Sequence, residues 1–508
     1  MIYIPKKVAH YAAIALFGLC IAPTFISYMP YAYRWDDSDY LQRSITVSRA
    51  FWSGNLHQVV MGIHSNRLPV MMLLGLPWGP LTSWDAAGKC FISLATLLSL
   101  LACICLYLML RIGIRPIALV IGSLCVFGSM GLGPLYTGSG AHRNATAFMA
   151  DNLVAWTSLA SLLLIPFEAK EKSLSMKSDI LRGILWGSIF SLGVLSKVSF
   201  FYFVILILPI LLIIRYRSRD IGSICVSLAA LALCSVPAAV YWLRYGQLAW
   251  SQATTSSFGR TADFYYTPLL PFLHGVIRES PGVLLTLAFV VGALAYVIIK
   301  KRTLVEGPTL IALLICIGFG VITLASTDRL IRFSFPAIVS IPFIAAILIS
   351  GREDSVSRRA SVLPSIFIFC GLVIAATPML HRPDRGCIAR CNAVLAEAAK
   401  LNANRILLAT DSATLNADLM RLAVAVSAWR DTAVVSSVNP LYGTSIEQDF
   451  QTMRECDLVV FQDERALYPP FTNERAPKYE LFAKQLSAGE AFRVGEDVTV
   501  YEVNRTAQ

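Results

Sequence analysis

The chain has 508 residues, of which 56% are hydrophobic and only 15% are charged. Soluble globular proteins carry about 25% charged residues, so this composition argues against a soluble protein. The formal net charge is +11. The basic residues gather in short loops between apolar runs, however, and that distribution argues against nucleic acid as a partner.

The apolar residues form runs of about 17 to 22 residues, long enough to cross the hydrocarbon core of a bilayer as helices. Helices satisfy their own backbone hydrogen bonds, so a polytopic α-helical membrane protein is predicted over 1–380. Two long segments outside the membrane are expected at 31–88 and 244–281. Eleven spans are expected near 8–30, 89–110, 116–133, 148–167, 181–197, 198–214, 221–243, 282–299, 308–325, 331–349 and 362–379.

Basic residues mark every second boundary between these spans. The positive-inside rule places such loops in the cytoplasm, so the N-terminus is expected inside and, after eleven spans, the C-terminus outside. No clear polar loop separates 181–197 from 198–214, but merging the two would reverse the charge pattern downstream, and they are predicted as separate spans. The basic positions are Lys6, Lys7, Arg111, Arg115, Lys170, Lys172, Lys177, Arg182, Arg215, Arg217, Arg219, Lys300, Lys301, Arg302, Arg352, Arg358 and Arg359.

The segment 381–508 has the composition of a soluble domain. Short β runs at 405–409, 432–437 and 457–462 alternate with helical stretches at 413–429 and 446–456, which predicts parallel βαβ units and an α/β fold. The turn after the first strand has no glycine-rich fingerprint, so nucleotide binding is not supported. A structural role or the docking of an acceptor is expected instead.

Nine of the twelve cysteines lie in or beside apolar segments, where they are expected to be packing residues. Cys387 and Cys391 lie beyond the last span and lack partners for a zinc site. On an oxidising face of the membrane they could close a small disulfide.

The first outside segment opens with three acids within four residues, Asp36, Asp37 and Asp39. One interpretation is a solvated loop at the membrane surface. The other is a carboxylate held there to take a proton from an acceptor hydroxyl, beside a lipid carrier whose buried tail keeps its phosphate at the interface. Asp39 itself is expected to be a solvated neighbour.

Arg67 follows in the same outside segment, within His64-Ser65-Asn66-Arg67-Leu68-Pro69. A guanidinium there could bind the donor's phosphate and stabilise charge on the leaving group. Alternatively, it is an interfacial arginine whose head reaches lipid headgroups.

Five short motifs lie in order along 30–350, each at the predicted outer end of a helix. They are Asp36-Asp37-Ser38-Asp39-Tyr40, Asn66-Arg67-Leu68-Pro69, His142-Arg143 through Asp151-Asn152-Leu153, Gly193-Val194-Leu195-Ser196-Lys197 and Arg332-Phe333-Ser334-Phe335-Pro336. Together they resemble the motifs of protein O-mannosyltransferases and lipid A aminoarabinose transferases, which are GT-C glycosyltransferases. Asp37 stands where those enzymes usually have Glu, and Arg67-Leu68 where they have Lys-Pro, which leaves the sugar open.

The resemblance implies an inverting sugar transfer from a polyprenyl-phosphate-linked donor, with Asp36 as the general base. It implies that Asp37 and Asp151 orient the acceptor or the sugar. Its motifs also provide the candidate substrate-binding residues, which are Arg67, Lys197, Arg332, Tyr40 and Arg143. Asp151 and Lys197 are candidates on independent grounds as well. An ionisable group within or at the edge of the membrane is costly to place there, so it is taken first as a candidate for function.

The six histidines form no ligand pattern, so the sequence supports no metal site, and no cofactor is expected. The expected partners are the lipid-linked donor, an acceptor of lipid, glycan or protein, and the membrane, which is expected to be a bacterial inner membrane. Alternative functions are a transporter or flippase, a membrane-anchored binding protein, and an O-antigen polymerase or ligase. A transporter is less favoured because the polar residues gather at the outer edge rather than at the midplane.

Overall fold

The computed structural model describes most of the helical bundle and of the C-terminal segment. The described residues are 6–25, 35–63, 67–131, 150–164, 176–201, 204, 221–258, 270–271, 274, 281–301, 335–350, 385–409, 412, 414–427, 433–438, 445–463, 470–487, 489, 491–495 and 497–504. Three helices within them are long and apolar enough to cross a membrane, over Asp85–Ile112, Asp179–Ser196 and Cys225–Ser251.

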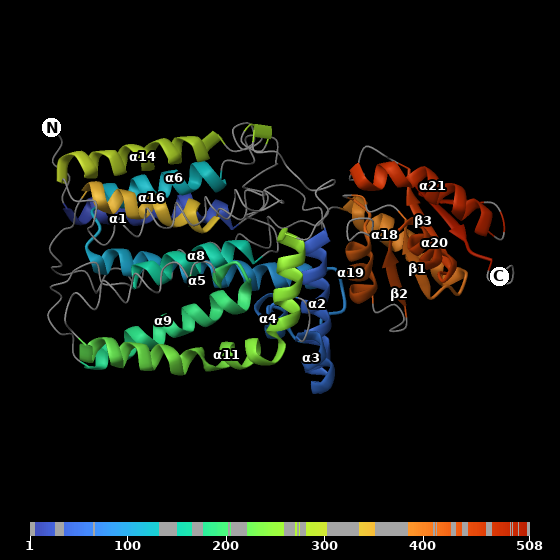
Figure 1. Ribbon diagram of the computed structural model, residues 1–508, viewed down its shortest axis with the longest axis horizontal. Coiled ribbons are helices and arrows are strands. Elements are labelled where there is room, and N and C mark those ends of the chain that lie inside the picture. Colours follow the sequence, from blue (N-terminus) through green and yellow to red (C-terminus); the bar gives the residue numbers. More distant parts are fainter. Residues whose placement is uncertain are drawn as a thin grey trace.

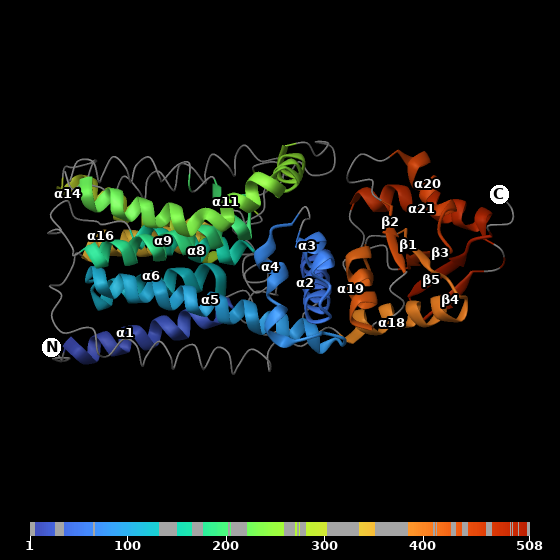
Figure 2. The same ribbon diagram turned by 90° about the horizontal axis from the view of Figure 1, so that it is seen from below.

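The membrane part is a bundle of helices that run side by side (Figures 1 and 2). Their apolar composition suits burial against one another and against lipid. The fully buried aromatic rings of Phe17, Trp156 and Phe343 belong to its core. The bundle comprises α1 (Lys6–Ile21) with the short η1 (Ala22–Thr24), α5 (Asp85–Ile112), α6 (Pro116–Val126) with η3 (Phe127–Gly131), α8 (Asp151–Leu163), α9 (Met176–Ser196), α11 (Ile221–Phe258), α14 (Pro281–Lys301) and α16 (Phe335–Ser350).

These helices correspond to eight of the eleven predicted spans. The break predicted after residue 197 is present: α9 ends at Ser196, and a turn brings Phe200 N within 3.1 Å of Lys197 O. The helix of the seventh predicted span is longer than the span itself, because α11 continues to Phe258, into the predicted outside segment. The spans predicted at 308–325 and 362–379, and most of 198–214, lie outside the described residues.

The first predicted outside segment is mainly helical. It contains α2 (Trp35–Trp52), α3 (Leu56–Ile63), α4 (Pro69–Leu73) and η2 (Leu76–Trp78). Helix α2 lies across the end of the bundle, roughly perpendicular to the bundle helices (Figure 1). Ser44 Oγ accepts a hydrogen bond from Gly75 N at 2.8 Å. A Cβ at Gly75 would come within 2.9 Å of the Ser44 backbone oxygen, so glycine permits this close approach.

The C-terminal segment folds as a five-stranded sheet with helices. The strand order is β2-β1-β3-β5-β4. The pairs β1–β2 and β1–β3 are parallel, as the βαβ pattern predicted, whereas β3–β5 and β4–β5 are antiparallel. The elements are α18 (Arg385–Lys400), β1 (Arg405–Leu408), α19 (Ala417–Ser427), β2 (Val434–Ser437), α20 (Ile446–Arg454), β3 (Leu458–Gln462), α21 (Pro470–Leu486), β4 (Phe492–Val494) and β5 (Val498–Glu502).

Cys387 and Cys391 are free thiols, so the disulfide considered from the sequence is absent. Both lie in α18, four residues apart, and both side chains are fully buried. This spacing puts them on one face of the helix, where they fill the apolar core. Burial also raises the pKa of the Cys391 thiol.

Helix α2 lies between the bundle and the C-terminal segment, with α19 packed against it (Figures 1 and 2). Arg49 in α2 makes a polar contact across this junction. Its Nη2 donates to Leu81 O at 2.9 Å and also to the Ala425 carbonyl at the end of α19. Helix α2 therefore has neighbours from distant parts of the chain.

Candidate active site

Two of the predicted site residues, Asp151 and Lys197, form an ion pair. Asp151 begins α8 and Lys197 follows the last residue of α9. Lys197 Nζ lies 2.5 Å from Asp151 Oδ1. The acid lies at the positive end of one helix dipole and the amine follows the negative end of the other, which is the favourable placement of each charge.

Burial makes this pair unusual. The Asp151 side chain is 3% exposed and that of Lys197 is 22% exposed. Asp151 Oδ2 is buried and has no hydrogen-bond partner within the part of the chain that the structure describes. A buried carboxylate oxygen without a donor costs free energy, and such groups are candidates for a functional contact.

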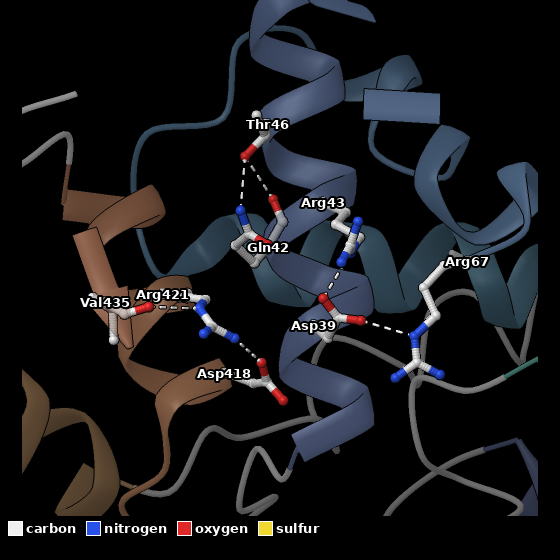
Figure 3. Close-up of polar contacts among 8 residues, drawn as sticks. All are labelled: Asp39, Gln42, Arg43, Thr46, Arg67, Asp418, Arg421 and Val435. Carbon is white, nitrogen blue, oxygen red and sulfur yellow. Dashed lines mark hydrogen bonds and ion pairs between the residues drawn. The ribbon is translucent and has the colours of Figure 1, made fainter. Parts of the chain in front are cut away.

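A second cluster forms where α2 meets the start of α4. Arg43 Nε lies 2.6 Å from Asp39 Oδ1, and Arg67 Nε lies 2.8 Å from Asp39 Oδ2 (Figure 3). The Arg67 guanidinium also lies over the ring of Tyr40, with Cζ 5.0 Å from the ring centroid. Tyr40 is thus a support for Arg67 in the structure.

The prediction that Asp39 is a solvated neighbour is wrong. Asp39 is 8% exposed and accepts from two arginines. The sequence showed an acid near a membrane surface, but several elements pack around α2, and Arg67 reaches Asp39 from the segment before α4.

Asp36 and Asp37 lie in the first turn of α2, about one turn before Asp39 and Tyr40. A carboxylate is favourable at this end of a helix, because the backbone N–H groups there carry partial positive charge. The structure describes the backbone position of both residues but not their side chains.

The two clusters lie near each other. Leu68, which follows Arg67, is buried in one small apolar cluster with Tyr241. Leu195 and Val198, which lie on either side of Ser196 and Lys197, pack against that cluster. Helix α4 also contacts α9. The chain therefore brings the Arg67 and Lys197 segments together at one end of the bundle, although they are far apart in sequence.

The remaining predicted site residues, Arg143 and Arg332, lie outside the described residues, as does His64. Among the residues that the structure does describe, no three His, Cys, Asp or Glu side chains gather as metal ligands. The sequence analysis missed Arg43, although its spacing of four residues from Asp39 is the signal that a helical reading of this segment would have used.

Comparisons with known proteins found matches by structure only. No model of a known protein family matches the sequence, and no curated protein sequence matches it. The structure is similar to that of ArnT from Cupriavidus metallidurans bound to undecaprenyl phosphate, with a TM-score of 0.52 and 12% identity over 97% of both chains.

Two further proteins of similar structure have longer chains than this one. The Archaeoglobus fulgidus oligosaccharyltransferase in its apo form has a TM-score of 0.53 and 12% identity, over 94% of this chain and 71% of its own. The arabinofuranosyltransferase AftD from Mycobacteria has a TM-score of 0.50 and 13% identity, over 99% of this chain and 40% of its own. At such identities these likenesses concern the fold, and they cover nearly the whole chain.

Proposed function

We propose that this chain, whose fold is that of the GT-C glycosyltransferases, transfers a sugar from a polyprenyl-phosphate-linked donor to an acceptor hydroxyl. The observation that carries the proposal is the convergence of the Arg67 and Lys197 segments at one end of the bundle, beside the start of α2. Two cations beside a group of carboxylates can hold a phosphate and serve acid–base chemistry in one place.

Arg67 and Lys197, with Arg332, bind the phosphate of the donor. The polyprenyl tail lies among apolar helices, so the phosphate stays at the membrane edge, where Arg67 precedes the start of α4 and Lys197 follows the end of α9. A guanidinium can offer paired donors to phosphate oxygens, while an ammonium acts as a point charge. Lys197 keeps Asp151 as its counter-ion until the phosphate enters.

Asp36 acts as the general base. It takes the proton of the acceptor hydroxyl while that oxygen bonds to the anomeric carbon, and the bond from this carbon to the phosphate oxygen breaks. The lipid phosphate leaves with the electron pair, and the configuration at the anomeric carbon inverts. Asp37 and Asp151 orient the acceptor or the sugar, and Tyr40 and Arg143 contribute to substrate binding. No nucleotide is needed, because the sugar arrives already activated on its lipid carrier.

The proteins with similar structures support this class of donor and acceptor. One ArnT structure contains undecaprenyl phosphate. An archaeal oligosaccharyltransferase was solved with an inhibitory peptide and a dolichol-phosphate. The sugar transferred by this chain is a hexose or a pentose. We place the reaction at the outer face of a bacterial inner membrane, with the C-terminal segment on the same side.

Mass spectrometry of envelope glycolipids and glycans, from cells with and without the chain, tests the proposal. The expected result is the loss of one hexose, pentose or amino-sugar mass from a single acceptor class, restored by the wild-type chain and not by Asp36→Asn. Complete restoration by Asp36→Asn would contradict the assigned base. Accumulation of an unaltered lipid-linked glycan on the cytoplasmic leaflet would instead indicate a flippase.

A further inference from the structure

Asp39 is a buried carboxylate to which the proposed reaction gives no role. Its two oxygens have different partners: Oδ1 accepts from Arg43 Nε at 2.6 Å and Oδ2 accepts from Arg67 Nε at 2.8 Å. Arg43 is one turn away in the same helix, whereas Arg67 is 28 residues away, immediately before Leu68 and α4. The carboxylate therefore joins two separate elements.

Two consecutive residues of α2 fix the orientation of Arg67. Asp39 holds Nε at one edge of the guanidinium, and the Tyr40 ring lies against its face. A planar group that is held at one edge and on one face has little freedom to rotate. In Figure 3 the terminal nitrogens of Arg67 point away from the carboxylate.

The support is itself rigid. Tyr40 is 6% exposed and Asp39 is 8% exposed, so neither can move without disturbing packed neighbours. One turn further along α2, Ser44 is held by Gly75 N, and Ser48 Oγ donates to Gly79 O at 2.7 Å. Helix α2 is therefore fixed to the segment that follows α4.

The charge of Asp39 also matters for the placement of Arg67. Its carboxylate lies between Arg43 and Arg67 and pairs with both guanidinium groups. Without the carboxylate, the two guanidinium groups would repel each other across a partly buried site, where charges are poorly screened. A neutral residue at position 39 would therefore weaken the placement of Arg67 as well as its hydrogen bond.

We propose that Asp39 is a positioning residue: it orients the Arg67 guanidinium towards the phosphate of the lipid-linked donor. The inference rests on the proposed function, which assigns Arg67 to that phosphate. It also gives a reason for arginine at position 67, because a lysine has neither an Nε to pair with Asp39 nor a plane to lie on Tyr40.

The test is a double-mutant cycle in the full-length chain, with undecaprenyl phosphate as the probe in nanodiscs. Asp39→Asn should weaken undecaprenyl phosphate binding by about tenfold when Arg67 is present, the effect of losing one charge-assisted contact. In the Arg67→Ala background the same substitution should change binding by less than about twofold. Arg67→Lys, which keeps the charge, should bind about as weakly as Asp39→Asn.

Arg43→Gln is the matched control, because it removes the other arm of Asp39 and leaves the contact to Arg67. It should change the affinity by less than about threefold, even where it lowers the melting temperature as much as Asp39→Asn does. A purely structural role for Asp39 would make affinity follow melting temperature in all variants, and the Asp39→Asn effect would persist without Arg67. That result overturns the positioning role.

The two proposals fail in different ways. If Arg67→Ala weakens undecaprenyl phosphate binding but Arg67→Lys and Asp39→Asn do not, the phosphate site stands and the positioning role is wrong. If Arg67→Ala leaves undecaprenyl phosphate binding unchanged, Arg67 does not bind the phosphate. The positioning role of Asp39 is then wrong as well. The Arg67→Lys arm decides the question even where Asp39→Asn does not fold.

Discussion

Lys197 Nζ lies 2.5 Å from Asp151 Oδ1, and this contact joins the end of α9 to the start of α8. The two residues are 46 positions apart. Because Asp151 is almost fully buried, the pair has a structural role as well as the proposed role in binding a phosphate. The two roles can be separated experimentally.

Lys197→Met should lower the stability of the chain, because it leaves the Asp151 carboxylate buried without its cation. Breaking a fully buried pair costs about 3 to 5 kcal/mol. Lys197 is 22% exposed, so the loss should lie at or below the low end of that range. The double variant Lys197→Met/Asp151→Asn should recover most of this stability, measured by thermal unfolding, but should not recover undecaprenyl phosphate affinity. Equal affinity in the wild type and the double variant would show that Lys197 serves only the fold.

Asp36→Asn should reduce turnover by about 10²- to 10⁴-fold, the usual contribution of general-base catalysis, with donor binding nearly unchanged. Asp37→Asn should have a smaller effect. Both would be measured with purified chain in nanodiscs as turnover and as donor affinity.

Asp85→Asn is the matched control for Asp36. Asp85 is also an acid in the first turn of a helix, and it is exposed at the start of α5. Its substitution should leave turnover within about twofold. If Asp36→Asn has normal turnover and Asp151→Asn has none, the general base is Asp151 in α8 rather than Asp36.

Arg49→Gln should loosen the contact between α2 and α19. It removes the guanidinium that donates to both Leu81 O and Ala425 O. We expect faster hydrogen exchange in α19, while the sheet of the C-terminal segment keeps its protection. Lys400→Gln is the control, because its ion pair with Glu397 is at the surface and contributes little. Unchanged exchange in α19 would mean that apolar packing alone holds it.

The C-terminal segment should lose stability in alkali through Tyr479. Burial, together with the hydrogen bond that its phenol donates to Asp449, raises the pKa of Tyr479 above the usual value of about 10. The folded state therefore holds this proton more tightly than the unfolded state. The resulting stability is fully present below about pH 10 and falls as the pH rises above it. Tyr479→Phe should be less stable at pH 8 and should show a shallower decline above about pH 10, measured by hydrogen exchange. Parallel declines would contradict this.

The predicted orientation can be tested with reporter fusions. Fusions after Arg219 and Arg302 should report a cytoplasmic location, and a fusion after Gln508 an external one, because the basic loops alternate along the chain. A cytoplasmic signal at Gln508 would place the C-terminal segment on the other side of the membrane from the one proposed.

Much of this protein follows from local sequence pattern. The length of the apolar runs predicted the bundle helices. In apolar surroundings a segment must satisfy its own backbone hydrogen bonds, and a helix does so. Alternating short β runs and helices predicted the parallel pairing of β1 with β2 and β3. The motifs placed Asp151 near a helix start and Lys197 at a helix end; in the structure Asp151 begins α8 and Lys197 directly follows α9.

What only the tertiary structure decided is which of these groups are covered and by what. The sequence indicated a solvated acid at Asp39, yet other elements pack against α2, and Arg67 reaches the carboxylate from a later segment. Arg49 meets Ala425 from 376 positions away. A local pattern states which face of an element is apolar, but burial of a charge depends on neighbours that the chain brings from elsewhere, and a buried carboxylate is stable only once those neighbours supply its cations.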